Sequence, residues 1–393
     1  MTALSEIGIS ARSTVTCVGA GKGAHVAAMR DLASGLSPCK LPGVEIPCHM
    51  GQVRGIEEIA FPKAQANWDN RASRLAVASL RADGFEDAVA AACARWGTQR
   101  VGVVLGTSTS GIERLEQVYR AWSGAGPLDP AYSMRHHNDH HAVTAFASDY
   151  LGTEGPAYTI STACSSSAKS IIDAAQLIQL GLCDAVVTGG VDSLCLTSVY
   201  GFESLELLSR APCRPFDADR DGLSIGEGAG FLLLERHAEG PHLAGFGETS
   251  DAINMSTPPE DGSGAAAAIR LALSRACLAP QDIGFLKMHG TATPANDSAE
   301  SAAVNGIFPA SVPAASLKGL VGHTLGAAGS VEAVMALDAM EAGIVPGSSG
   351  LCKSAPDLGR PIPSKTVEAR YSHTLCNAFG FGGSNCALVF SAT

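Results

Sequence analysis

Residues 157–180 read AYTISTACSSSAKSIIDAAQLIQL, and this stretch decides the fold class. An apolar run at 157–164 ends in small polar residues and passes directly into a segment with helical spacing at 165–180. Within that helix Lys169, Asp173 and Gln176 form one narrow polar stripe, so we expect most of its surface to be buried. A short buried strand followed at once by a buried helix is typical of an α/β protein.

The same alternation of apolar runs and Ala-rich helical segments continues along the chain. Further strands are predicted at 101–111, 184–193, 230–237 and 283–294, and further helices at 71–82, 264–276 and 298–306. Residues 376–390, CNAFGFGGSNCALVF, predict two strands joined by a Gly-rich hairpin. Near residues 164 and 289 alike, a buried strand ends in a reactive side chain and leads into a helix. We therefore predict two similar halves, residues 1–240 and 241–393.

Composition narrows the classes of function. The chain has 393 residues, of which 46% are hydrophobic and only 17% are charged, so we expect a sizeable subunit interface. The net charge of −11 argues against nucleic-acid binding. We expect no membrane segment, because no apolar run approaches the roughly 18 residues that a spanning helix needs. The twelve cysteines form no CxxC pair and no Cys/His cluster, which predicts a cytoplasmic protein without a metal site.

Cys164 is the candidate nucleophile, because it stands where a strand stops and a helix starts. The positive end of the helix dipole and the free N–H groups there favour a thiolate, which predicts a lowered pKa for this thiol. A small buried thiol beside a helix cap is the alternative at this point.

Two histidines are candidate partners of this cysteine. His289 is predicted at a strand end, followed by the hydroxyls of Thr291 and Thr293, and His323 in a small-residue loop that leads into a helix. Each could be a hydrogen-bonded core histidine. Together, two neutral imidazoles can donate two Nε2–H bonds to one developing enolate oxygen.

Five segments resemble the signature motifs of the β-ketoacyl-acyl-carrier-protein synthase I/II family, in the family's order. They are TACSSS (162–167), RPFDADRDGLSIGEGAG (214–230), KMHGTATPAND (287–297), LKGLVGHTLGAAG (317–329) and NAFGFGGSN (377–385). The resemblance implies a thiolase-like fold, in which two pseudo-duplicated α/β halves form five αβαβα layers. It also implies a dimer, either of two copies or with a related synthase subunit.

The resemblance further implies a decarboxylative Claisen condensation between an acyl thioester on Cys164 and malonyl-acyl carrier protein. No free cofactor is implied, because the acyl carrier protein holds the substrate on its phosphopantetheine. His289 and His323 would stabilise the enolate, and the N–H groups of Cys164 and Phe381 would bind the thioester oxygen. Lys318 and Glu300 would form a charged pair behind the histidines.

The resemblance also implies where substrates bind. Thr291 and Thr293 would contact the pantetheine arm, and Phe381 would gate the acyl and malonyl pockets. The predicted lining of the acyl pocket is Ser108, Thr109 and Phe202, and the predicted carrier-protein docking residues are Lys63, Arg71 and Arg74.

Departures from the family pattern suggest a subgroup. The segment GTSTSGI replaces a more glycine-rich family segment, and with the weakly matching N-terminal hundred residues it resembles the synthases of aryl-polyene pathways. Two alternatives to an elongating synthase are a non-catalytic, chain-length-factor-like subunit of a heterodimer and a thiolase acting on coenzyme A thioesters.

Overall fold

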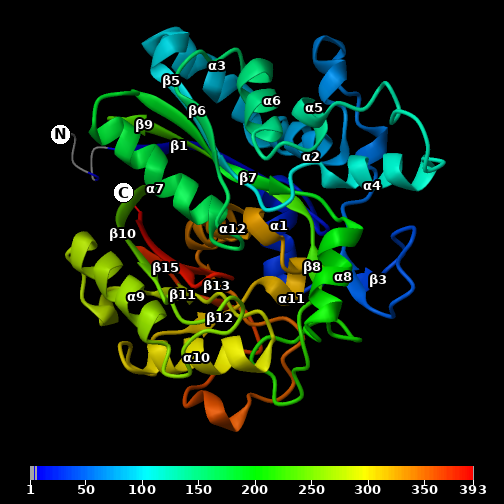
Figure 1. Cartoon of the computed structure of the whole chain (residues 1–393). Coiled ribbons are helices and arrows are strands. Elements are labelled where there is room, and N and C mark those ends of the chain that lie inside the picture. The colour runs from blue at the N-terminus through cyan, green and yellow to red at the C-terminus, as the bar shows by residue number, and fades with distance from the viewer. Residues whose placement is uncertain (1–3, 5–6, 393) are drawn as a thin grey trace.

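Two groups of five strands with the same connectivity form the main sheet of the computed structural model, which describes residue 4 and residues 7–392 (Figure 1). The first group has the order β6-β5-β7-β9-β1, and the second has the order β12-β11-β15-β16-β10. When the strands of each group are numbered from one to five in chain order, both groups have the spatial order 3-2-4-5-1. The third, second and fourth strands run parallel, and the last two pairings are antiparallel.

The strands of the first group are β1 (Ile7–Thr16), β5 (Val101–Gly106), β6 (Ala157–Ile160), β7 (Ala185–Asp192) and β9 (Gly228–Arg236). Those of the second are β10 (His242–Ser250), β11 (Phe285–Lys287), β12 (Ala314–Ala315), β15 (His373–Gly380) and β16 (Ser384–Ser391). A strand lies within each range predicted from sequence, and β15 and β16 form the predicted hairpin. The strand predicted at 283–294 is confirmed only over 285–287, and the one predicted at 101–111 ends at 106. The predicted division after residue 240 lies in the loop between the two groups.

Each group of strands forms one layer, and helices form three further layers around the two groups. The central layer is α7 (Ser166–Gln179) and α12 (Ala328–Ala342), which contact each other and strands of both groups. The first group is covered on its outer face by α2 (Arg71–Leu80), α3 (Phe85–Trp96) and α6 (Ala142–Leu151), and the second by α9 (Ser263–Ala276) and α10 (Pro294–Asn305). The order is therefore αβαβα, as the resemblance implied.

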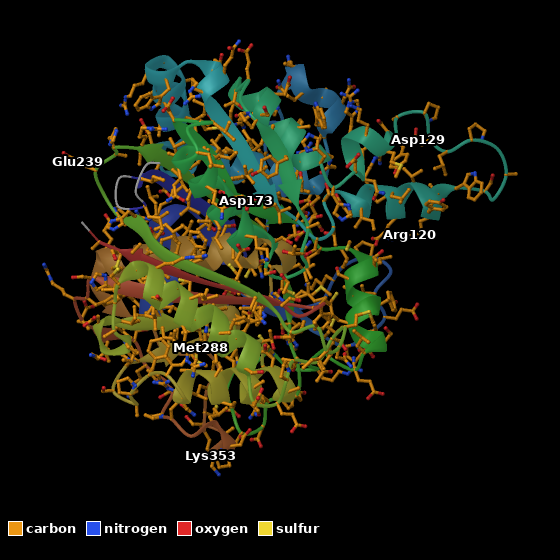
Figure 2. The ribbon with its side chains drawn as sticks, turned by 60° about the vertical axis from the view of Figure 1, so that its left-hand side comes forward. Arg120, Asp129, Asp173, Glu239, Met288 and Lys353 are labelled. Atoms are coloured by element: carbon orange, nitrogen blue, oxygen red, sulfur yellow. The ribbon has the colours of Figure 1, made fainter. Side chains whose placement is uncertain are left out.

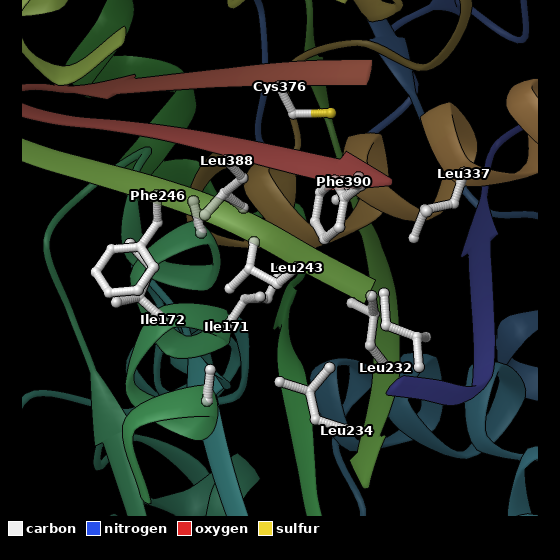
Figure 3. Close-up of a cluster of buried hydrophobic side chains, with 14 of the residues drawn as sticks. Ile171, Ile172, Leu232, Leu234, Leu243, Phe246, Leu337, Cys376, Leu388 and Phe390 are labelled. Atoms are coloured by element: carbon white, nitrogen blue, oxygen red, sulfur yellow. The ribbon is translucent and has the colours of Figure 1, made fainter. Parts of the chain in front are cut away.

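The core between the two strand groups is built from aliphatic and aromatic side chains of both halves (Figure 3). Ile171 and Ile172 of α7 are fully buried there, opposite Leu388 and Phe390 of β16. Each such side chain contributes roughly 1.5–3 kcal/mol by leaving water. As predicted, the polar stripe of α7 is its least buried face, which fixes the rotation of the helix that follows Cys164.

The two halves correspond differently from the sequence prediction, which matched residue 164 with residue 289. Cys164 lies between the third strand of its group, β6, and the central helix α7. His323 lies between the third strand of the other group, β12, and the central helix α12. His289 follows β11, the second strand. The topological counterpart of Cys164 is therefore His323, and the predicted match was wrong.

One segment projects from the body of the first half. It consists of α4 (Ile112–Ala121) and the loop after it, where Arg120 and Asp129 lie far from the buried Met288 (Figure 2). Within the described part of the chain, no helix combines the length and apolar character needed to cross a bilayer.

Candidate active site

Cys164 lies in the turn between β6 and α7, as predicted. The preceding residue, Ala163, has a φ of 53°, in the left-handed region that residues other than glycine rarely adopt. Ser166 holds this turn, because its hydroxyl donates to the Ala163 carbonyl (2.6 Å) and accepts from the Thr162 N–H (2.9 Å). The nucleophile thus stands on a backbone conformation that the surrounding hydrogen bonds maintain.

His323 is brought to this cysteine by a short helix, α11 (Lys318–Val321), and by β8 (Ile225–Gly226). The N–H of His323 donates to the Ser224 carbonyl (2.8 Å), and the Gly226 N–H donates to the His323 carbonyl (2.9 Å). These bonds place Nε2 of His323 3.0 Å from Sγ of Cys164. Two residues 159 positions apart therefore share one site.

His289 completes the group from the end of β11. Its ring lies 5.4 Å from that of His323, centroid to centroid, at an interplanar angle of 85°. Nζ of Lys318 lies 3.4 Å from its Nδ1. An ammonium can only donate, so this contact leaves the proton of the neutral ring on Nε2. His289 can therefore act as a hydrogen-bond donor through Nε2.

Both imidazoles are neutral at physiological pH. Burial lowers the pKa of His289 and of His323 well below the ordinary value of 6.5, and the positive charge of Lys318 lowers both further. Neutral rings are the form in which the two histidines can stabilise an enolate by hydrogen bonds.

The thiol of Cys164 differs from the sequence prediction. Burial raises its pKa to about 11, although Lys318 and the backbone N–H of Phe381 each lower it. The predicted lowering was wrong because desolvation of a fully enclosed sulfur outweighs the nearby positive groups. The resting residue is therefore a thiol, and Nε2 of His323 is placed to accept its proton.

The buried lysine behind His289 has a different partner from the one predicted. Lys318 Nζ pairs with Glu332 Oε1 at 2.6 Å, whereas Glu300 accepts the N–H groups of His289 (2.7 Å) and Gly290 (2.8 Å). The predicted Lys318–Glu300 pair was wrong, because Glu300 on α10 faces the backbone of the histidine loop. Sequence reasoning missed Glu332, although a carboxylate between apolar residues, in GSVEAVMAL, signals a buried partner.

A cavity of about 190 Å³ surrounds the three side chains. Phe202 and Phe381 both line it, with their rings 5.7 Å apart, and so do Thr291 and Thr293, whose hydroxyls are 2.9 Å apart. Phe381 comes close to the nucleophile because its neighbour is a glycine. A Cβ on Gly380 would lie 2.7 Å from the carbonyl of Thr162.

Ser108 and Thr109 lie outside the lining of this cavity. Their N–H groups donate to the carboxylate of Asp192 at 2.8–3.1 Å, and Gly326 donates to the same carboxylate at 2.6 Å. Asp192 is fully buried at the end of β7. It links the loop after β5 to the segment that follows His323, a role that the sequence analysis did not find.

The three predicted docking residues are not equivalent. Lys63 is exposed, but Arg71 donates to the buried carboxylate of Glu227 (2.7 Å from Nε), and Arg74 pairs with Asp69 at 2.6 Å. Arg71 and Arg74 border a larger cavity of about 890 Å³. The lining of this cavity includes none of Cys164, His289 and His323. The prediction for Arg71 was wrong, because its guanidinium is committed inside the protein.

The fold and the site together define a class. Five αβαβα layers, with a cysteine before one central helix and a histidine before the other, are those of a thiolase-like condensing enzyme. Within the described residues, no cluster of three or more His, Cys, Asp or Glu side chains is placed to hold a metal ion.

The chain belongs to the β-ketoacyl synthase family. Residues 63–240 match the family's model "Beta-ketoacyl synthase, N-terminal domain", and residues 242–351 match "Beta-ketoacyl synthase, C-terminal domain". The 3-oxoacyl-[acyl-carrier-protein] synthase 2 of Vibrio cholerae is 35% identical, covering 74% of this chain and 75% of that protein. Nodulation protein E of a Rhizobium species is 31% identical, covering 86% and 87%. The predicted enzyme class, an acyltransferase of this family, is confirmed.

Solved structures confirm the fold. A ketosynthase in complex with its chain length factor from Xenorhabdus doucetiae gives a TM-score of 0.90 at 34% identity, covering 99% of this chain and 98% of that chain. A β-ketoacyl synthase from Burkholderia phymatum gives 0.89 at 27% identity, covering 99% of both chains.

Proposed function

We propose that this chain condenses an acyl group held on Cys164 with malonyl-acyl carrier protein, releasing CO2 and lengthening the acyl chain by two carbons. One observation carries the proposal: the Cys164 sulfur and two neutral imidazoles line the same cavity, with Sγ and Nε2 of His323 3.0 Å apart. An acyl carrier protein is the proposed partner, and the cytoplasm the proposed location.

In the first half-reaction, the sulfur of Cys164 attacks the acyl thioester. Its proton passes by way of His323 to the departing carrier thiol, so the acyl group changes sulfur without net loss of a proton. The N–H groups of Cys164 and Phe381 bind the oxyanion. The Phe381 N–H already acts on the resting sulfur, because it lowers the pKa of the thiol.

In the second half-reaction, the malonyl group loses CO2, and the electron pair of the broken bond forms an enolate. The two Nε2–H groups stabilise the enolate oxygen, and the enolate carbon attacks the thioester on Cys164. When this enolate displaces the Cys164 sulfur as a thiolate, one proton taken up from water by way of His323 restores the thiol. Thr291 and Thr293 line the same cavity as the cysteine and are proposed to bind pantetheine.

Intact-protein mass spectrometry after incubation with acyl-carrier protein tests the first step. We expect the mass of one acyl group on the wild type and none on Cys164→Ala, and then CO2 and a β-ketoacyl product once malonyl-carrier protein is added. Absence of any acyl adduct would favour the second candidate, a chain-length-factor-like subunit. Turnover of coenzyme A thioesters without carrier protein would favour a thiolase instead.

The second candidate concerns the partner subunit. The structures from Xenorhabdus doucetiae and of the ishigamide system are ketosynthases associated with a chain length factor. We propose a dimer, with a second copy or such a related subunit. The aryl-polyene subgroup stays a prediction, and the acyl group trapped on Cys164 after expression with the native carrier protein would identify it.

A further inference from the structure

A second buried lysine, Lys287, lies behind the two histidines. It is the last residue of β11, two positions before His289, and it is 1% exposed. Its Nζ donates to Glu332 Oε2 and to the backbone carbonyl of Asn377, both at 2.5 Å. A buried ammonium is costly unless it is paired and hydrogen-bonded, and these two contacts satisfy that condition.

One route from Lys287 to the site runs through Glu332. The two oxygens of this carboxylate are divided between two lysines, Oε2 for Lys287 and Oε1 for Lys318 at 2.6 Å. Lys318 in turn donates to the His289 carbonyl at 2.6 Å and lies 3.4 Å from its Nδ1. The position of Lys318 against the imidazole therefore depends on a carboxylate that Lys287 also holds.

The other route runs through β15. The backbone of Asn377 accepts the bond from Lys287, and its side chain donates to Glu300 Oε1 at 2.9 Å. That same oxygen accepts the N–H of His289 at 2.7 Å. Both routes end on His289, so the hydrogen bonds form a closed ring around the loop that presents the imidazole.

We propose that Lys287 is a positioning residue of the condensation: it anchors this ring, and its positive charge adds to the groups that oppose protonation of both imidazoles. The inference rests on the function proposed above.

Four charged groups lie directly behind the histidines: Lys287 from β11, Lys318 from α11, Glu332 from α12 and Glu300 from α10. Asp297 on α10 lies next to Glu300, and Nε of Arg220 is 3.8 Å from the Asp297 carboxylate. The thiol of Cys376 on β15 also faces Lys287, and burial raises its pKa to about 12, so it stays uncharged. Two ammoniums and two carboxylates therefore balance, and loss of Lys287 would leave one unit of negative charge in a buried place.

The sign of the effect on the histidines follows. Burial first and then the charge of Lys318 lower the pKa of both His289 and His323. Lys287 lowers both pKa values further, and for His289 its effect comes after that of His323. Removing one positive charge must raise both values. Because the neutral form is the active one, the acid limb of the decarboxylation profile should move to higher pH.

The test measures CO2 release from malonyl-carrier protein against pH for Lys287→Met and Lys287→Gln. Glutamine keeps a donor for the Asn377 carbonyl but carries no charge. Comparing the two variants therefore separates the effect of the lost charge from that of the lost hydrogen bond. We expect the acid limb of both variants to rise by at least about half a pH unit, with a lower kcat and an unchanged KM. The matched control is Lys169→Met, which removes the ion pair between Lys169 of α7 and Glu248 of β10 (2.9 Å). This substitution should leave the acid limb of the profile at the wild-type pH.

The double variant Lys287→Met/Glu332→Gln removes one charge of each sign. If charge is the cause, its acid limb should return toward that of the wild type. If Lys287→Met does not fold, Lys287→Gln, which keeps a hydrogen-bond donor for the Asn377 carbonyl, carries the test. An acid limb that stays at the wild-type pH in the folded single variants would overturn the inference. A wild type that releases no CO2 at any pH would contradict the proposed function itself.

Discussion

Gly329 sets the distance between the two central helices, and an alanine there should pull Cys164 and His323 apart. A Cβ built on Gly329 of α12 lies 2.5 Å from the backbone nitrogen of Ala168 on α7 and 3.0 Å from its Cα. Ordinary contact begins at 3.4 Å, so the two backbones must separate by about 1 Å (3.4 minus 2.5). No side chain can rotate to relieve this contact, because the atoms it meets are the backbone of Ala168 and its Cβ, which has no rotatable bond.

The magnitude follows from where these helices begin. Cys164 precedes α7 and His323 precedes α12, so a shift of about 1 Å stretches the 3.0 Å contact between Sγ and Nε2 beyond hydrogen-bond range. Overpacking of a core costs roughly 1–3 kcal/mol, and a misplacement of about 1 Å at reacting groups costs on the order of 10²-fold in rate. We expect Gly329→Ala to fold, with reduced stability and about a hundredfold slower condensation.

The assay combines urea unfolding with turnover of acyl- and malonyl-carrier protein. The matched control is Gly23→Ala in α1 (Gly21–Asp31), where a Cβ meets no atom within 4 Å. That variant should keep full activity and gain about 0.5–1 kcal/mol of stability. The reasoning would be refuted by a Gly329→Ala enzyme that condenses at the wild-type rate, or by an equal loss of rate in the control.

Two further predictions concern charge. Because the neutral forms of His289 and His323 are active and burial lowers the pKa of both well below 6.5, CO2 release should hold its plateau down past pH 6.5 and fall only in more acidic buffer; a half-maximal rate at pH 6.5 or above would contradict this. Arg71→Met leaves the buried carboxylate of Glu227 without its guanidinium and should cost about 3–5 kcal/mol in urea unfolding. Lys63→Met at an exposed site should change stability by less than about 0.5 kcal/mol, and equal effects of the two substitutions would speak against the buried pair.

The parts of the fold that the sequence predicted are those in which the local pattern decides. Strand β5 and helices α2, α7 and α9 lie within one or two residues of their predicted starts, because each has a clear apolar pattern and a clear end. Helix α12 escaped prediction over most of its length, because residues 328–340 are buried on every side and carry no amphipathic period.

The sequence could not predict which charged side chains, far apart in the chain, pair with each other in the folded protein. Glu300 and Glu332 are both buried carboxylates near Lys318, and which of them faces the ammonium depends on how α10 and α12 are turned. The same limit applies to Arg71, whose helix was predicted correctly. Its partner, Glu227, lies 156 positions away, within a motif that sequence analysis assigned only to the family pattern.

The two histidines differ in one respect that suits the proposed reaction. Lys318 beside Nδ1 of His289 holds the proton of that ring on Nε2, whereas Nδ1 of His323 has no hydrogen-bond partner among the described residues. A buried ring without such a partner can hold its single proton on either nitrogen. The acyl transfer needs Nε2 of His323 as an acceptor, because burial keeps Cys164 a thiol, and the condensation needs the same atom as a donor to the enolate. The fixed tautomer of His289 serves the second step alone, while the unfixed tautomer of His323 lets one imidazole serve both.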